Sequence, residues 1–168
     1  MKIAMDHHDG ANETLLTDEV RVIETHIDDM NPEHLGFLME RLLDEGALDV
    51  AFSPLQMKKN RPAVKLTVVA PPPLLLHLTR IILRESTAIG VRHYSAERLK
   101  LERTAETRQT TLGEIRVKVL SEAGAVVRVA PEYEECRRLA LETGTPIAEV
   151  YRIVERETGC FCKLEAKK

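Results

Sequence analysis

Four carboxylates and one imidazole lie in the ten-residue segment that runs from Glu24 to Glu33. The adjacent carboxylates Asp28 and Asp29 repel each other, so a nearby cation favours the state in which both are ionised. Oxygen ligands of this kind suit Mg²⁺ or Mn²⁺, which proteins commonly share with the phosphates of a substrate. We therefore predict a divalent-metal site at Asp28, Asp29 and Glu33.

The same segment has a second interpretation. Asn31 and Pro32 predict the start of a helix. Asp28 or Asp29 would then accept the free N–H groups of its first turn and be favoured by the helix dipole. The residue types and their spacing leave both interpretations open.

A basic turn, Lys58-Lys59-Asn60-Arg61, is the second candidate for chemistry. It carries three cations with few acidic residues near in sequence. Arg can hold phosphate oxygens with two parallel hydrogen bonds, whereas Lys acts as a point charge. The turn is either an anion site or a solubilising hairpin tip, and the polar, proline-bearing segment before it (53–57) favours the anion site.

A third candidate segment joins a predicted helix to a predicted strand and runs from Thr87 to Arg92. Gly90 permits close approach of the backbone, which brings Thr87 and Arg92 within reach of an oxygen-rich ligand. The alternative for Gly90 is that it simply ends the helix.

Softer metal ligands stand near the two ends of the chain, in Asp6-His7-His8-Asp9 and Cys160-Phe161-Cys162. The histidines suit Ni²⁺ or Zn²⁺, but they lie in a segment without periodicity. The cysteines have one intervening residue, unlike the CxxC spacing of zinc and redox sites. We expect a fixed metal site at neither place. The motifs GxxxxGK(S/T), GxGxxG and GxSxG are absent from the sequence.

The elements that must position these residues follow from the apolar periodicity. Strands are predicted over 21–27, 48–52, 64–68 and 91–101, with helices over 32–46 and about 73–87. This β-α-β-β-α-β order is typical of a ferredoxin-like unit. Beyond it, strands over 112–120 and 126–130 form a hairpin, and helices open at Pro131-Glu132 and Thr145-Pro146.

The fold class is therefore α+β: a ferredoxin-like βαββαβ unit followed by a smaller α+β unit made of a β-hairpin and two helices. We place a linker or disordered tail at 1–18, the ferredoxin-like domain at 19–103 and the smaller domain at 104–160. A C-terminal tail covers 161–168. Because residues 1–18 resemble an interdomain linker, we expect further chain before them.

The charge distribution supports two kinds of ligand. Residues 1–49 carry 13 acids and 3 bases, whereas residues 50–168 carry 14 acids and 21 bases. The first region suits cations and the second suits anions. An aromatic content of 4% with no Trp gives little support for nucleic-acid binding. No apolar run has membrane-spanning length and no signal peptide is evident, so we expect a cytoplasmic protein without membrane contact.

Four ordered blocks of sequence then carry a resemblance: 24–33, 46–50, 56–62 and 85–92. Together they resemble the C-terminal domain of LarC, the nickel-insertion family that serves the nickel-pincer cofactor of lactate racemase. The resemblance covers residues 20 to about 155. This sequence departs from the family pattern at His26, where Asn is expected, and at Ala63, where Gly is expected. The first departure changes a polar contact and the second changes the hairpin backbone.

The resemblance implies a CTP-dependent nickel chelatase of the lyase class. The full-length protein would insert nickel into a pyridinium bisthiocarboxylate mononucleotide while CTP is cleaved to CMP and diphosphate. An N-terminal domain would precede this one, and the chain alone would bind CTP without completing nickel insertion. A homo-oligomer, either a trimer or a hexamer, is also implied.

In that interpretation CTP binds together with Mg²⁺ or Mn²⁺. The expected metal ligands are Asp28, Asp29 and Glu33. The expected nucleotide-binding residues are Lys58, Lys59, Asn60, Arg61, Thr87, Gly90 and Arg92. The sequence identifies no catalytic residue. Two other functions stay open: a structural oligomerisation domain, and a regulatory nucleotide-sensing domain of ferredoxin-like fold.

Overall fold

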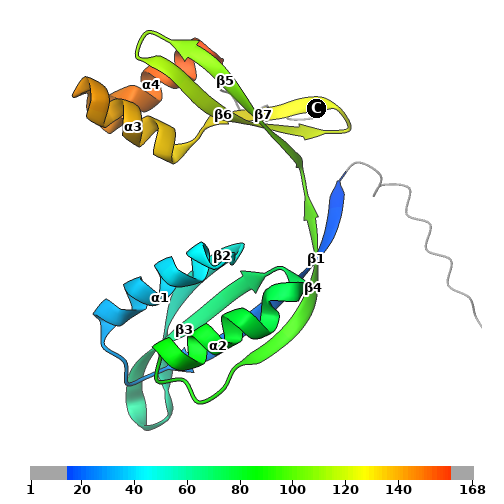
Figure 1. Cartoon of the computed structure of the whole chain (residues 1–168), viewed down its shortest axis with the longest axis vertical. Coiled ribbons are helices and arrows are strands. Elements are labelled where there is room, and N and C mark those ends of the chain that lie inside the picture. The colour runs from blue at the N-terminus through cyan, green and yellow to red at the C-terminus, as the bar shows by residue number, and fades with distance from the viewer. Residues whose placement is uncertain (1–14, 160–168) are drawn as a thin grey trace, which may run out of the picture. The chain divides into compact units, whose positions relative to one another are not determined.

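The computed structural model describes residues 15–159 (Figure 1). The chain divides into two compact units, Thr17–Arg98 and a second unit that begins at Leu99. The sequence analysis places its boundary after residue 103. The histidines and cysteines near the two ends, at positions 7, 8, 160 and 162, lie outside the described residues. Within the described part, no helix combines the length and the apolar character that a bilayer crossing needs.

The first unit is the predicted ferredoxin-like fold. Its elements are β1 (Leu16–Ile27), α1 (Pro32–Asp44), β2 (Asp49–Met57), β3 (Arg61–Ala70), α2 (Leu75–Glu85) and β4 (Arg92–Lys100). The strand order is β2-β3-β1-β4, and β3 pairs antiparallel with both β1 and β2. This order confirms the predicted βαββαβ arrangement. β1 begins at Leu16, within the range that the sequence assigns to a linker.

The four-stranded sheet has two different faces. α1 and α2 cover one of them (Figure 1), and the core of the unit lies between these helices and the sheet. Ile23 and Ile27 on β1 and Leu66 on β3 are buried in that core. Because successive side chains of a strand point to opposite faces, the alternate residues Glu24 and Lys65 lie on the uncovered face.

The start of α1 settles one of the alternatives left by the sequence. The side-chain Oδ1 of Asn31 accepts a hydrogen bond from the backbone N–H of Glu33 at 3.1 Å. A cap of this kind stabilises a helix by about 1 kcal/mol. The capping bond therefore comes from Asn31, as the sequence predicts, and not from Asp28 or Asp29.

The second unit is also α+β. Its elements are β5 (Glu102–Thr110), β6 (Gly113–Glu122), β7 (Ala125–Pro131), α3 (Tyr133–Thr143) and α4 (Ile147–Thr158). The strand order is β5-β6-β7. Its core packs the inward residues of β6 and β7, such as Val117 and Val129, against Leu139 on α3 and Val154 on α4.

The strand β5 is an addition to the predicted hairpin. It pairs antiparallel with β6 along its whole length, from Glu102 opposite Ser121 to Thr110 opposite Gly113. Most of its side chains are exposed and polar, so the segment lacks the apolar alternation by which a strand is recognised. The small sheet therefore has three strands in the described residues, where the sequence predicts two.

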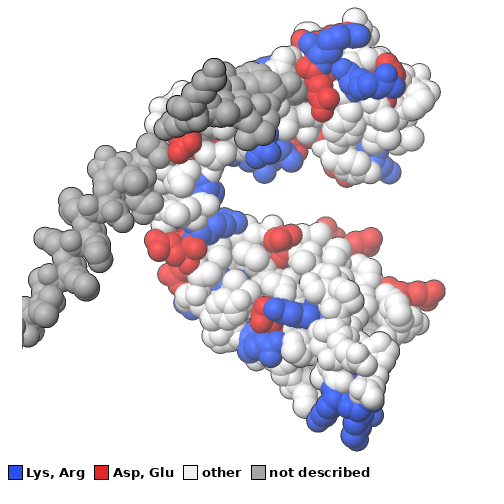
Figure 2. All heavy atoms as spheres, turned by 180° about the vertical axis from the view of Figure 1, so that it is seen from behind, with Lys and Arg blue, Asp and Glu red and all other residues white. Residues whose placement is uncertain are grey.

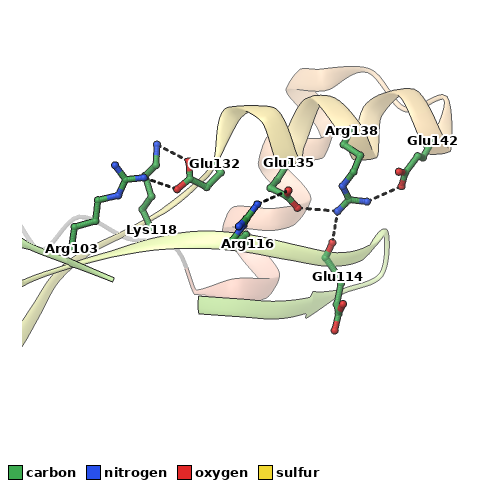
Figure 3. Close-up of polar contacts among 8 residues, drawn as sticks. All are labelled: Arg103, Glu114, Arg116, Lys118, Glu132, Glu135, Arg138 and Glu142. Atoms are coloured by element: carbon green, nitrogen blue, oxygen red, sulfur yellow. Dashed lines mark hydrogen bonds and ion pairs between the residues drawn. The ribbon is translucent and has the colours of Figure 1, made fainter. Parts of the chain in front are cut away.

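Ion pairs link the start of α3 to the strands of this sheet (Figure 3). Glu132, just before α3, accepts from Lys118 Nζ at 2.8 Å and from Arg103 Nη2 at 2.9 Å. Glu135, in the first turn, pairs with Arg138 at 3.0 Å and with Arg116 at 3.6 Å. Burial raises the pKa of Glu132, but the hydrogen bonds from Lys118 and Arg103 outweigh it and lower that pKa below 4.5. The hydrogen bond from Arg138 lowers the pKa of Glu135 in the same direction.

These lowered pKa values predict acid sensitivity of the second unit. A carboxylate whose pKa is lower in the folded state than in the unfolded state stabilises the fold at higher pH, and that stabilisation is lost as pH falls below about 4.5. We expect the melting temperature of the chain to fall between pH 6 and pH 3. In the variant Glu132→Gln/Glu135→Gln the fall should be smaller, because these two carboxylates no longer titrate. An equally steep fall in the variant would assign the acid sensitivity to other groups.

Candidate functional site

The predicted metal ligands and the predicted anion-binding turn meet at one end of the four-stranded sheet. Ile27, the last residue of β1, lies opposite Val64 of β3. β2 and β3 are joined at the same end, where Met57 lies opposite Arg61. The pairing of three strands therefore brings the junction after β1 beside the β2–β3 turn, although the two are far apart in sequence.

An ion pair joins these two segments directly. Arg61 Nη1 lies 3.2 Å from Asp28 Oδ2, with side-chain exposures of 54% and 22% respectively. Arg61 is thus held at the acidic junction and still largely open to solvent. A guanidinium has five N–H donors, so one bond to Asp28 leaves the others able to hold phosphate oxygens.

The rest of the basic turn is exposed to solvent. Lys58–Asn60 form a short 3₁₀ helix, and the φ angles of Lys59 and Asn60 are +61° and +56°. Asn adopts this left-handed region readily, whereas Lys does so at a steric cost. Lys and Arg side chains gather at this end of the first unit (Figure 2). Positive φ angles at two successive residues are typical of tight hairpin turns, so the anion-site and hairpin-tip interpretations of this turn both stay open.

The connection between α2 and β4 reaches the same strand β1. Thr25 Oγ1 donates a hydrogen bond to the carbonyl oxygen of Gly90 at 2.9 Å. α2 ends at Glu85 and its C-terminal cap is Ser86, so the alternative role of Gly90 as the helix-ending residue is wrong. A Cβ placed on Gly90 would meet no atom within 4 Å, which leaves open space at this position. Thr87 lies in the same connection, and among the described residues it makes no hydrogen bond to the other candidates.

Arg92, at the start of β4, lies against β1. Its Nε donates to Glu24 Oε2 at 3.1 Å, and its Nη2 donates to His26 Nε2 at 2.5 Å. Because a guanidinium only donates, His26 Nε2 is the acceptor in this bond. The polar contact at this position is therefore made by His26, the residue that stands where the resemblance leads us to expect Asn.

Two residues at this end of the sheet, Lys65 and Glu24, were assigned no binding role in the sequence analysis. Lys65, on β3, lies opposite His26 and pairs with Glu24 Oε1. The hydrogen bond from Lys65, together with that from Arg92, lowers the pKa of Glu24 against the opposing effect of burial. One sequence signal existed: Lys65 interrupts the apolar strand 64–68 at a position where a solvent-facing residue is expected.

The predicted metal ligands fit a shared cation rather than a closed protein site. Among the described residues, no group of three His, Cys, Asp or Glu side chains converges to hold a metal ion. Asp28 supplies hard oxygen atoms next to the basic turn, Asp29 is the next residue and is exposed, and Glu33 lies in the first turn of α1. Proteins usually bind Mg²⁺ through one or two carboxylates, and phosphate oxygens and water supply its other ligands. A cation held here would therefore take its remaining ligands from water or from a bound phosphate.

Comparisons with known proteins identify the family to which the chain belongs. Residues 1–151 match the family described as nickel insertion protein. A relative from Geotalea uraniireducens (strain Rf4) is 64% identical over 145 residues, which are 86% of this chain and 37% of the relative. A relative from Citrifermentans bemidjiense is 68% identical over 141 residues, which are 84% of this chain and 36% of the relative. The curated names of both contain the words nickel insertion protein, and this chain spans less than two fifths of either one.

Solved structures extend the comparison. One is titled LarC2, the C-terminal domain of a cyclometallase involved in the synthesis of the NPN cofactor of lactate racemase, in the apo form. It is 39% identical with a TM-score of 0.80, and the match covers 86% of this chain and 99% of that one. A protein of Methanopyrus kandleri AV19 is 28% identical with a TM-score of 0.59, over 83% and 88% of the two chains. The resemblance found in the sequence is thus confirmed, and the chain belongs to the nickel insertion protein family.

Proposed function

We propose that this chain binds CTP together with Mg²⁺ or Mn²⁺, as the C-terminal part of a nickel insertion protein. The observation that carries the proposal is the ion pair between Asp28 and Arg61. It brings carboxylates suited to a divalent cation and cations suited to phosphate to one end of one sheet. A metal-bound triphosphate needs both kinds of group side by side.

In this proposal the basic residues of the site bind the triphosphate and the acidic residues bind the divalent cation. Lys58, Lys59 and Arg61 neutralise the triphosphate, and Asn60 donates its amide N–H groups. Asp28 and Asp29 hold the cation, either directly or through water, with Glu33 as a further ligand. A bound Mg²⁺ or Mn²⁺ supplies additional positive charge to the phosphate oxygens.

The α2–β4 connection contributes a second set of contacts. Gly90 lets the nucleotide approach the backbone, because no atom stands where its side chain would be. Thr87 offers a hydroxyl group, and Arg92 offers the N–H groups that Glu24 and His26 leave free. These contacts orient the nucleotide between the connection and the basic turn.

The proposed reaction of the full-length protein is nickel insertion with cleavage of CTP to CMP and diphosphate. Negative charge develops on phosphate oxygens when a phosphoanhydride breaks, and a positive clamp stabilises that charge. Nickel and the pyridinium bisthiocarboxylate mononucleotide are substrates in this scheme. We propose that an N-terminal domain of the full-length protein completes the insertion. We include in the proposal a homo-oligomer, either a trimer or a hexamer, which sedimentation analysis of the chain would test.

Calorimetric titration of the chain with CTP, in the presence and absence of Mn²⁺, tests the proposal. We expect CTP to bind at least about tenfold more tightly with Mn²⁺, because the cation bridges carboxylate and phosphate oxygens. CMP, which lacks two of the phosphates, should bind much more weakly than CTP under both conditions. Failure of CTP to bind, or equal binding of CTP and CMP, would contradict the proposal.

A further inference from the structure

Glu24 lies between two cations on the uncovered face of the four-stranded sheet. Lys65, on β3, pairs with its Oε1, and Arg92, on β4, donates to its Oε2 at 3.1 Å. Each oxygen of the carboxylate therefore pairs with one cation: Oε1 with Lys65 of β3, and Oε2 with Arg92 of β4. His26 accepts a further bond from Arg92, so that these four residues form one connected group across β1, β3 and β4.

The burial of this group is uneven. The side chain of Glu24 is 11% exposed, whereas those of Lys65 and Arg92 are 34% and 56% exposed. The carboxylate is thus covered while both cations stay open to solvent. An ammonium has three N–H donors and a guanidinium has five, and Glu24 and His26 occupy only part of them. The group therefore presents unused donors and a net positive charge outward.

The group is continuous with the basic turn. Lys65 is on the same strand as Arg61 and lies about 13 Å farther along it. Both side chains are long, so one extended polyanion can meet both. Asp28 offsets the charge of Arg61 in the same way that Glu24 offsets that of Lys65.

We propose that Lys65 is a further phosphate-binding residue and that Glu24 is a positioning residue, which holds Lys65 and Arg92 in place for the ligand. The inference deepens the proposed function and rests on it. A free lysine side chain loses rotamer freedom when it binds a ligand, which weakens binding. Lys65 is already ordered by Glu24, so it loses less.

The positioning role of Glu24 predicts a change in CTP affinity opposite to the one that its negative charge alone would predict. A carboxylate near a polyanion repels it, so removal of a carboxylate that acts only through its charge would strengthen CTP binding. Removal of a carboxylate that orders two cations weakens CTP binding instead. The direction of the change therefore separates the two roles.

The first test measures CTP binding to the chain with Mn²⁺ by calorimetry. Lys65→Met should weaken binding about tenfold or more, the loss expected for one charge-assisted hydrogen bond. The dependence of the dissociation constant on salt should also become less steep, because one ion contact is gone. Lys65→Arg keeps the cation and its pairing with Glu24 and should retain most of the affinity. Wild-type affinity and salt dependence in Lys65→Met would overturn the inference.

The second test compares two carboxylate-to-amide changes of equal charge. Glu24→Gln should weaken CTP binding about fivefold or more. Glu40→Gln, on the exposed face of α1, should leave it unchanged or slightly stronger. Equal or stronger binding in Glu24→Gln would overturn the positioning role. If Glu24→Gln does not fold, as a thermal melt will reveal, Glu24→Asp takes its place: it keeps the charge but shortens the side chain, and wild-type affinity for CTP in this variant would overturn the positioning role.

These tests separate the inference from the proposed function. A wild-type chain that binds no CTP removes the proposed function and the inference with it. A chain whose CTP binding depends on Lys58 and Lys59 but not on Lys65 overturns the inference alone.

Discussion

Replacing Lys58 with Ala and Lys59 with Gly is expected to weaken CTP binding by a hundredfold or more. Each lysine supplies one charge-assisted phosphate contact of about 1.5–3 kcal/mol, so two contacts give about 3 kcal/mol or more. Gly is chosen at position 59 because the φ angle there is +61°, which Gly adopts without strain. The fold should therefore be kept, and the melting temperature should not fall. Calorimetry with CTP and Mn²⁺ at fixed ionic strength measures the effect.

A matched control removes two charges elsewhere in the same unit. Arg80→Ala/Arg84→Ala changes exposed residues of α2 and lowers the net charge by the same amount. It should leave the dissociation constant for CTP nearly unchanged, because general attraction between exposed charges is largely screened by salt. If both double variants weaken binding equally, net charge explains the effect and the triphosphate does not lie on the β2–β3 turn.

Local patterns in the sequence predict most of the first unit. Asn31 and Pro32 predict the start of α1, and in the structure the side chain of Asn31 makes the capping hydrogen bond. The apolar alternation of β1 and β3 matches the face that α1 and α2 cover. Both signals arise from short-range chemistry, namely a helix cap and the two-residue period of a strand, so they are visible without the fold.

The strand β5 could not be found in the same way. Its side chains are mainly Glu, Arg, Thr and Gln, and the strand is held by backbone hydrogen bonds to β6. An edge strand with little buried surface has no apolar pattern to mark it. Its partner is decided by tertiary structure, which a local reading of the sequence does not include.

In the candidate site, too, some features can be predicted from local sequence and others depend on the tertiary structure. Its loops are recognisable because unusual residue types crowd together in them, as in the segments around Asp28 and Lys59. Lys65 was missed because its meaning depends on register: only the pairing of β1 with β3 places it opposite His26 and beside Glu24. The ion pair between Asp28 and Arg61 joins residues separated by 33 positions in the chain. Such contacts follow from strand pairing and cannot be derived from either segment alone.

Asp28→Asn should change the metal dependence of CTP binding in two opposite directions. With Mn²⁺ present we expect CTP to bind about tenfold or more weakly, because the carboxylate acts on the nucleotide through the cation. Without Mn²⁺ we expect equal or tighter binding. The variant no longer repels the triphosphate, and it releases Arg61 from its present partner. The measured quantity is the ratio of the two dissociation constants, which should fall toward one.

Asp49→Asn provides the matched control for this change, since Asp49 is exposed and lies at the opposite end of β2. It alters the net charge equally and should keep the wild-type ratio. The capping bond of α1 comes from Asn31, so Asp28→Asn should leave the melting temperature nearly unchanged. A variant that melts at a lower temperature yet keeps its Mn²⁺-dependent binding would show that Asp28 only holds Arg61 in place. The cation would then have to be bound through Asp29 or by the phosphates alone.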